Sequence, residues 1–377
     1  MFAHAILGGG VAASRLATRL AEGGHGPVLL IDPMAHDPRT LALFADPADS
    51  WWEPFVLHRW LRIAVRAGGR RVVRRPAYPY VIVRAQALRE RAYRAVQAAE
   101  GKVHRGTIAS IKETEASVRI RLEDGSVYQA SWVYDARLDE PRHPSAMRQT
   151  FAGVWVETES PTFDPDETLL MDFDPFAAGP PAESVRFAHA LPTSDRHALV
   201  MAVSIGPGRP TLPVGTWLPR VLPTTDLHTV TAYESGSLPL FTVDTNCRLG
   251  PRCLRIGYPG GLLKTPFGDA VQRIDEDARA IVAAVAETGA PAIPKRRHAV
   301  QWRWLDRVLL SLVTERGQQA SQVFMALFQR QPIDAVIDFL EERATCSDVL
   351  GLMVKLPRWG WFASAGWHQL TLPSTPR

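Results

Sequence analysis

The chain is poor in the residues that build covalent or metal-held scaffolds. Only three of its 377 residues are cysteine, namely Cys247, Cys253 and Cys346, and no histidine cluster accompanies them. A zinc site is therefore not expected, and the scarcity of cysteine favours a reducing, cytoplasmic setting. The H-E-x-x-H, G-x-S-x-G and Walker motifs are absent as well, so metalloprotease, serine hydrolase and phosphoryl-transfer functions have no support.

Long apolar runs are also missing. No uninterrupted stretch reaches the ~20 residues that a transmembrane helix requires. The first predicted strand begins at residue 2, so we expect no signal peptide. We expect a cytoplasmic protein that is either soluble or peripheral to a membrane. The run from Leu350 to Phe362, with Lys355 and Arg358 on its flanks, fits an ordinary packed helix better than a membrane-dipping segment.

The net charge of +4 conceals a local excess of arginine. One short segment holds Arg62, Arg66, Arg70, Arg71, Arg74 and Arg75. Such a cluster suits phosphate, anionic lipid or nucleic acid, but a solvated face with one or two cofactor contacts is the favoured interpretation, and we expect no nucleic-acid partner. The composition, 46% apolar and 22% charged, excludes wholesale disorder and suits one large or two interleaved domains.

The strongest positive signal lies in the first forty residues. A short buried strand, Phe2–Leu7, leads into a G-x-G-x-x-A turn at Gly8–Ala13 and then into a helical pattern. A second apolar run, Val28–Ile31, ends at Asp32. A strand before the turn, a helix after it and an acid at the tip of the next strand are together typical of a dinucleotide-binding crossover.

Each part of this motif has a physical role in cofactor binding. Gly8 permits the tight turn, Gly10 lets the backbone approach a pyrophosphate, and Ala13 keeps the helix close to the strand. The free N–H groups and positive dipole end of the first helical turn face the phosphates, and Asp32 is placed to accept hydrogen bonds from a ribose. The cofactor-binding candidates are Gly8, Gly10, Val11, Ala12, Ala13 and Asp32.

The remaining pattern divides the chain into strand-rich and helical parts. A helix is predicted over residues 85–100, and beyond Gly268 the chain is predicted to be helical to its end. The predicted strands between residues 150 and 245 are Phe151–Glu157, Leu169–Phe173, Val185–Leu191, Ala198–Ile205 and Leu238–Thr242. This stretch fits an antiparallel sheet inserted into a nucleotide-binding domain, to which Cys253–Gly257 returns as a buried strand.

In this order the parts resemble those of the lycopene cyclase family of flavoproteins. Besides the glycine turn and Asp32, the resemblance rests on short motifs along most of the chain. These are Asp135–Arg137 (D-[GAS]-R in the family), Gln149–Gly153 (Q-x-F-x-G), Met171–Phe173 (M-D-F), Phe187–Pro192 (F-x-x-x-L-P), Glu234–Pro239 (E-x-G-x-x-P), and Arg255–Gly261 with Lys264–Gly268 in the place of the late flavin loop. Each motif is weak alone, but their order and spacing are fairly specific.

The resemblance implies an α/β fold: a three-layer, Rossmann-type FAD-binding domain with an inserted antiparallel β-sheet substrate domain and a helical C-terminus. We expect the FAD domain over residues 1–145 and 246–300, the substrate domain over 146–245 and the helical region over 301–377.

The resemblance further implies an enzyme that uses reduced FAD without net redox turnover, with NAD(P)H considered as the electron source. Such an enzyme cyclises the end of an apolar polyene. An acid protonates an alkene in a dry pocket, and π-rich surroundings stabilise the carbocation. The further cofactor contacts that it implies are Asp135, Arg137, Gly257, Lys264 and Gly268.

The sequence departs from the family pattern in two places. On the strand after the L-P motif, an acidic F-L-E-E-T-like stretch is replaced by Ala198–Ser204, which has no carboxylate. In the late loop, P-T-T-G-Y in relatives, little besides Gly268 survives, and Asp269 follows it. Lycopene itself is therefore not the expected substrate.

Four residues are candidates for proton transfer in place of the missing acids, namely Glu234, Asp172, Asp269 and His189. Glu234, which precedes a predicted strand, fits bonding to nearby backbone N–H groups at least as well. Asp269 fits a helix cap equally well. Asp172 fits an outward-pointing strand acid, and His189 fits a histidine bonded to backbone.

We expect cyclisation or double-bond isomerisation of an apolar polyene, such as a carotenoid or a related natural product. The alternatives are a flavin-dependent oxidoreductase or monooxygenase on the same scaffold, and a relative that binds without catalysing, because fold alone does not settle chemistry. The oligomeric state stays open.

Overall fold

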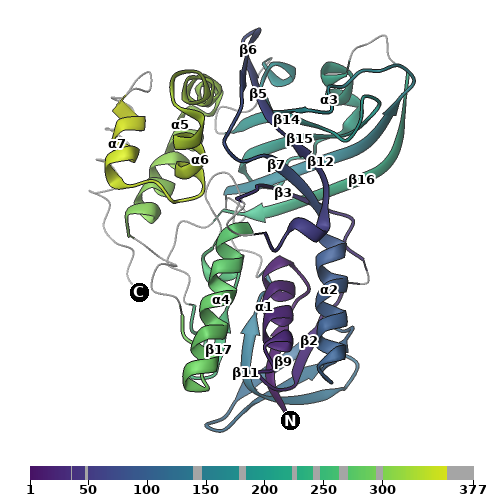
Figure 1. The fold of residues 1–377 in the computed structure, drawn as a ribbon, viewed down its shortest axis with the longest axis vertical. Coiled ribbons are helices and arrows are strands. Elements are labelled where there is room, and N and C mark those ends of the chain that lie inside the picture. Colours follow the sequence, from purple (N-terminus) through teal and green to yellow (C-terminus); the bar gives the residue numbers. More distant parts are fainter. Residues whose placement is uncertain are drawn as a thin grey trace.

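The computed structural model describes residues 1–34, 36–46, 50–138, 147–177, 184–222, 227–240, 247–262, 271–293 and 300–354. Two main bodies are stacked along the long axis of the molecule (Figure 1). The crossover that begins at the N-terminus fills one body, and a large antiparallel sheet fills the other. The C-terminal helices lie beside that sheet.

A seven-stranded sheet forms the centre of the first body. Its strands are β1 (Phe2–Leu7), β2 (Val28–Ile31), β8 (Lys102–His104), β9 (Ile108–Glu113), β10 (Val118–Leu122), β11 (Val127–Asp135) and β17 (Cys253–Arg255). β8, β2, β1, β11 and β17 run parallel, and β10 and β9 continue antiparallel from the first half of β11. β2 is wholly buried, as expected for a parallel strand that is covered on both faces.

Helices cover one face of this sheet, and the β9–β10 hairpin contributes to the apolar cluster on the other. The helices are α1 (Val11–Glu22), α2 (Ala85–Ala98) and α4 (Val271–Thr288). Leu16 of α1 and Ile281 of α4 share a buried cluster with Ile6 of β1. Ile120 of β10 belongs to the cluster of Leu7 on the opposite face.

A second seven-stranded sheet forms the other body. Its strands, in sheet order, are β16 (His228–Pro239), β12 (Met147–Thr158), β15 (His197–Pro207), β14 (Val185–Pro192), β13 (Glu167–Asp172), β5 (Arg62–Ala67) and β6 (Arg70–Arg74). All neighbours are antiparallel except β13 and β5. Because β5 and β6 come from before residue 145, two distant stretches of chain build this sheet.

Both faces of the second sheet are covered, so its central strands are apolar on both sides. Val203 and Ile205 of β15 share a buried cluster with the long helix α5 (Val300–Arg330). Val200 and Ala202 of the same strand face α3 (Val214–Val221) in a separate cluster. Side chains alternate along a strand, so residues with odd and even numbers lie on opposite faces.

A small third sheet lies where the two bodies meet (Figure 1). It contains β3 (Thr40–Phe44), β7 (Tyr80–Arg84) and β4 (Val56–Trp60). The remaining elements are α6 (Ile333–Leu340), α7 (Cys346–Val354) and the short 3₁₀ turns η1 (Glu53–Phe55), η2 (Asp174–Phe176) and η3 (Tyr258–Gly260). In the described part of the chain, no helix combines the length and apolarity needed to cross a bilayer. Beyond Val354, the run to residue 362 lies outside the described residues.

Strand β16 corrects the predicted pattern between residues 228 and 242. The sequence pattern places a strand after Glu234, whereas β16 runs from His228 to Pro239 with Glu234 in its interior. β16 is an edge strand whose first six residues are mostly exposed. Edge strands can be polar on both faces, so the apolar alternation that marks a half-buried strand is missing here.

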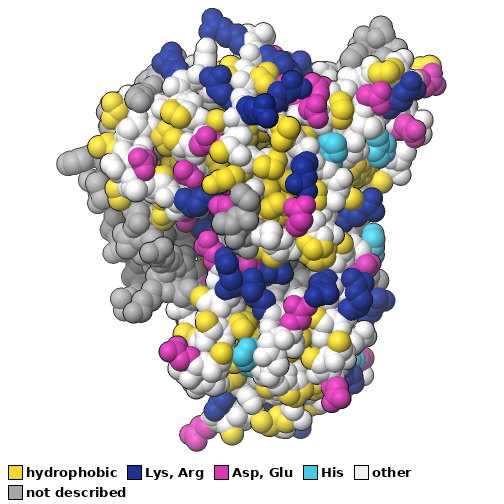
Figure 2. All heavy atoms as spheres, in the orientation of Figure 1, with side chains coloured by type: hydrophobic (Ala, Val, Ile, Leu, Met, Phe, Trp, Pro, Cys, Tyr) yellow, Lys and Arg dark blue, Asp and Glu magenta, His cyan; other side chains and the backbone are white. Residues whose placement is uncertain are grey.

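Acidic partners neutralise much of the arginine cluster on the β5–β6 hairpin. Arg66 pairs with Asp172, and Arg71 pairs with Glu167. Arg74 instead donates from Nε to the Phe328 carbonyl oxygen at 2.9 Å. Figure 2 shows basic side chains at this end of the molecule with acidic ones among them. These contacts support a role in fastening the hairpin to its sheet and to α5.

A buried ion-pair network joins α1 to α4. Asp275 of α4 has a fully buried side chain. Its carboxylate accepts a hydrogen bond from Arg15 Nε at 2.7 Å and one from Arg19 Nη2 at 2.8 Å. Arg279 Nε lies 3.4 Å from Asp275 Oδ2.

We predict that Asp275→Leu lowers the free energy of unfolding by about 3–5 kcal/mol, because it removes the buried carboxylate that Arg15 and Arg19 share. Urea denaturation measures the effect. The matched control is Glu22→Leu, which breaks an exposed pair with Arg91 and should cost less than about 1 kcal/mol. Equal losses in the two variants would contradict the prediction.

Candidate functional site

A cavity of about 320 Å³ lies between the glycine turn and the antiparallel sheet. Gly10, Val11 and Ala12, at the start of α1, line one part of it together with Gly257. The sheet side is mostly apolar, and its lining includes Phe151, Met171, Phe187, His189, Met201 and Val203. The volume is at the small end of the ~300–1,000 Å³ range of ligand pockets.

The glycine turn leaves the start of α1 open to this cavity. Gly8 has a φ of 105°, which favours glycine. Gly10 is the N-cap of α1, and no side chain caps the helix. A Cβ built on Gly10 would meet nothing within 4 Å, and Gly10, Val11 and Ala12 line the cavity, so the start of the helix is open to it. An anion, such as a pyrophosphate, fits such a helix start.

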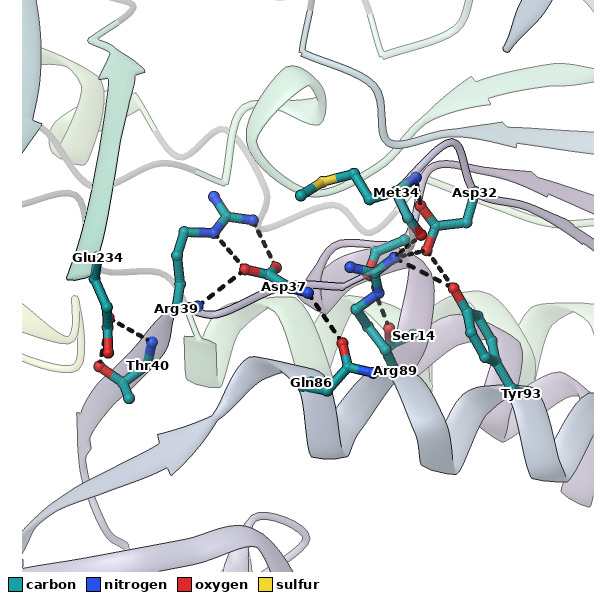
Figure 3. Close-up of polar contacts among 11 residues, drawn as sticks. Ser14, Asp32, Met34, Asp37, Arg39, Thr40, Gln86, Arg89, Tyr93 and Glu234 are labelled. Carbon is teal, nitrogen blue, oxygen red and sulfur yellow. Dashed lines mark hydrogen bonds and ion pairs between the residues drawn. The ribbon is translucent and has the colours of Figure 1, made fainter. Parts of the chain in front are cut away.

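The predicted ribose acid, Asp32, is already engaged by helix α2 (Figure 3). Its Oδ2 accepts hydrogen bonds from Tyr93 Oη at 2.6 Å and from Arg89. Its Oδ1 accepts from the backbone N–H of Met34 at 3.0 Å. Asp32 is buried and is not among the lining residues of the cavity, so its contact with a ribose stays a prediction.

The late loop packs directly on the first turn of α1. Gly257 has a φ of 66°, and a Cβ there would lie 2.6 Å from the Cβ of Ala12.

Asp135 and Arg137 form an ion pair, with Arg137 Nη2 2.8 Å from Asp135 Oδ2. This pair closes the turn on either side of Ala136, which lines the cavity. The predicted residues Lys264, Gly268 and Asp269 lie outside the described residues.

Glu234 is held by three donors, and its contact with Thr40 links β16 to β3 (Figure 3). Its Oε2 accepts from Thr40 N at 2.9 Å and from Thr40 Oγ1 at 3.1 Å, and its Oε1 accepts from Trp155 Nε1 at 2.8 Å. Burial raises the pKa of Glu234, against the lowering effect of these hydrogen bonds. Glu234 is not among the lining residues, and this geometry supports a structural role.

Asp172 faces away from the cavity. Its neighbour Met171 lines the cavity, whereas the Asp172 carboxylate is fully buried against Arg66. Asp172 also accepts from the backbone N–H of Asp174 at 3.1 Å. These contacts favour the fastening of β13 to β5 over proton transfer.

His189 is the one predicted proton-transfer residue that lines the cavity in the described part of the chain. Its ring meets Phe187 edge-on, with centroids 5.1 Å apart, and its Nδ1 is buried without a hydrogen-bond partner. Burial lowers the pKa of His189 to about 4, although a backbone hydrogen bond with Leu170 acts in the opposite direction. The imidazole is therefore neutral at neutral pH.

One ionisable pair on the lining, Asp37 and Arg39, was not predicted. Arg39 Nε and Nη2 each lie 2.7 Å from an oxygen of Asp37. Burial opposes ionisation, but the hydrogen bonds and charge of Arg39 outweigh it and lower the pKa of Asp37. The sequence places both residues in a proline-containing loop without periodicity, so no local signal marked them. Arg89 was also missed, although an arginine between the apolar Leu88 and Ala92 of a helix is a usable signal.

Two of the family-like motifs face each other in the sheet. Phe151 of β12 stands opposite Gly236 of β16, and Gly153 stands opposite Glu234. On its other side Gly153 pairs with Met201 of β15. The Q-x-F-x-G and E-x-G-x-x-P motifs therefore form one wall of the cavity together.

The family model described as lycopene cyclase protein matches residues 4–365. The chain belongs to the lycopene cyclase family. This confirms the predicted resemblance. No curated protein sequence shows a significant match to this family member.

Solved structures of flavoproteins share the fold. The halogenase PltM, in complex with phloroglucinol and FAD, aligns with a TM-score of 0.58 at 11% identity over 90% of this chain and 82% of its own. A triple mutant of the flavin-dependent brominase Bmp2 gives 0.60 at 11% identity over 99% and 100%. A flavoprotein/dehydrogenase from Cytophaga hutchinsonii gives 0.57 at 12% over 90% and 92%. At these identities the likeness concerns the fold, and it confirms the predicted fold class.

We predict that Gly10→Val abolishes flavin uptake without unfolding the protein. A Cβ at residue 10 meets nothing within 4 Å, but the added side chain takes up space at the helix N-terminus, where phosphates would lie. Flavin content after reconstitution, read from the absorbance spectrum, should fall at least tenfold. Gly215→Val, in α3, is the control because a Cβ there also meets nothing. Normal flavin content in Gly10→Val would count against the site.

We predict that Glu234→Gln destabilises the protein by about 1–3 kcal/mol, because an amide cannot accept all three hydrogen bonds with both of its polar atoms. Thermal and urea unfolding measure the loss. Asp164→Asn, which alters an exposed partner of Arg62, is the control and should change stability by less than about 1 kcal/mol. An unchanged stability in Glu234→Gln would refute the structural role.

Proposed function

We propose that this member of the lycopene cyclase family is a FAD-dependent enzyme that cyclises or isomerises an apolar polyene without net redox change. The observation that carries the proposal is the cavity. It joins an open dinucleotide-type helix start to an apolar sheet wall, and His189 stands in that wall. Its volume suits one end of a long polyene better than the whole molecule.

The residues present fit the cofactor. The start of α1, which no side chain caps, suits the pyrophosphate, and the Gly257 loop packs on the same turn. When bound, reduced FAD would supply an electron-rich ring that stabilises nearby positive charge. We consider NAD(P)H as the source of its electrons.

The chain's own residues would exclude water and move protons. Phe151, Phe187 and Met201 provide an apolar, polarisable wall that suits a carbocation. His189 is neutral at neutral pH, so it suits removal of a proton from the carbocation, which places the final double bond.

A separate acid must open the reaction. Asp37 is the one carboxylate on the described lining, and Arg39 keeps it ionised. An ionised carboxylate cannot donate a proton. Asp269, which lies outside the described residues, therefore stays our candidate for the initial acid.

A flavin-dependent oxidoreductase or monooxygenase is the second candidate, and the fold shared with halogenases favours it. Expression in a polyene-producing host, followed by mass analysis, separates the two functions. A product with the mass of its substrate supports the proposal. A gain of oxygen or a loss of two hydrogens would overturn it, and so would a folded protein that takes up no flavin.

We predict that His189→Leu lowers turnover by roughly 10²–10⁴-fold, the usual contribution of one proton-transfer group, and leaves flavin content unchanged. Product formation per bound flavin measures the effect. The control is His104→Leu, in β8, which removes a histidine paired with the exposed Asp124 and should keep full activity. An active His189→Leu variant would remove His189 from the mechanism.

A further inference from the structure

Two glycines of the antiparallel sheet lie beneath the side chains that form the cavity wall. The ring of Phe151 extends across Gly236, so that a Cβ at residue 236 would lie 2.6 Å from Cε1 and 2.7 Å from Cζ of that ring. Met201 extends across Gly153 in the same way, and a Cβ at residue 153 would lie 2.5 Å from its Cγ. Contacts below 3 Å cannot be kept, so in either case a neighbour would have to move.

Space, and not backbone conformation, requires glycine at these two positions. Neither Gly153 nor Gly236 has a positive φ, and both lie inside regular strand pairs. Glycine weakens a strand interior because it has no side chain to pack, and an aromatic side chain that covers a cross-strand glycine partly restores that packing. Each glycine thus leaves the space that the side chain of its cross-strand partner occupies, Phe151 over Gly236 and Met201 over Gly153.

Both covering side chains face the cavity. Phe151 and Met201 line it, and the next residues across the sheet, Val203 and His189, line it too. If the side chain of Phe151 or Met201 pointed away from the sheet instead of lying across its glycine, it would enter the space beside His189. The depth of the cavity at its sheet end therefore depends on the two glycines.

We propose that Gly236 and Gly153 determine how large an apolar substrate end the cavity accepts. The inference deepens the proposed function and rests on it, because it assumes that an apolar chain end enters this cavity. Gly236 should have the larger effect, because a phenyl ring is rigid and Met201 can adopt other rotamers.

The test compares binding of linear isoprenoid alcohols of ten, fifteen and twenty carbons, with lycopene as the longest probe. Quenching of tryptophan fluorescence gives the dissociation constants for the flavin-loaded protein. In Gly236→Ala, affinity for the twenty-carbon alcohol should fall about tenfold more than affinity for the ten-carbon alcohol, as expected for overpacking of a filled site. Gly153→Ala should shift the ratio of the dissociation constants for the twenty- and ten-carbon alcohols in the same direction, but by less.

A double variant separates cavity shape from loss of folding. Gly236→Ala/Phe151→Leu removes the ring carbons that would clash, so it should restore the ratio of the unchanged protein. A crystal structure of Gly236→Ala should show the Phe151 ring moved into the cavity. Gly215→Ala is the control, because a Cβ there meets nothing.

The outcomes separate the role of the two glycines from the proposed function. If the unchanged protein binds the alcohols, but the ratio is the same in Gly236→Ala and Gly153→Ala, the glycine inference is overturned alone. If the unchanged protein binds none of the probes, the proposed substrate class falls, and the inference falls with it.

Discussion

One buried carboxylate ties the antiparallel sheet to the small sheet that lies where the two bodies meet. Glu234 belongs to the edge strand of the antiparallel sheet, and two of its three hydrogen bonds reach Thr40 at the start of β3. Thr40 follows in sequence the loop that begins at Asp32, directly after β2. The wall formed by Gly236 and Phe151 is therefore held at a set position relative to the crossover, and so is any cofactor bound there.

The parts of the fold that depend on neighbours in sequence could be predicted. The strand, the glycine turn, the first helix and Asp32 lie within the first 32 residues, and their geometry follows from local chemistry. The pairing of Phe151 with Gly236 could not be predicted in this way, because it depends on the register between β12 and β16. β16 itself gave a weak signal, since an edge strand can be polar on both faces.

The same limit applies to two of the candidates for proton transfer, Asp172 and His189. Met171 and Asp172 are adjacent, so they point to opposite faces of the sheet, but the strand alone does not reveal which face holds the cavity. In many sheets one face is polar and exposed to solvent, which identifies the other face as the buried one. Here α5 covers one face and α3 the other, so both faces read as core. Only the assembled sheet puts His189 on the cavity wall and turns Asp172 toward Arg66.

The loss of carboxylates from β15 and the low pKa of His189 are parts of one electrostatic condition. Met201 stands directly across from His189, and both line the cavity. A carboxylate on this side of β15 would favour the charged imidazolium and raise the pKa of His189. An apolar Met201 instead leaves the imidazole neutral and ready to accept a proton. The departure from the family's acidic strand is therefore consistent with a wall that receives protons, which requires the proton that opens the reaction to arrive from elsewhere in the cavity.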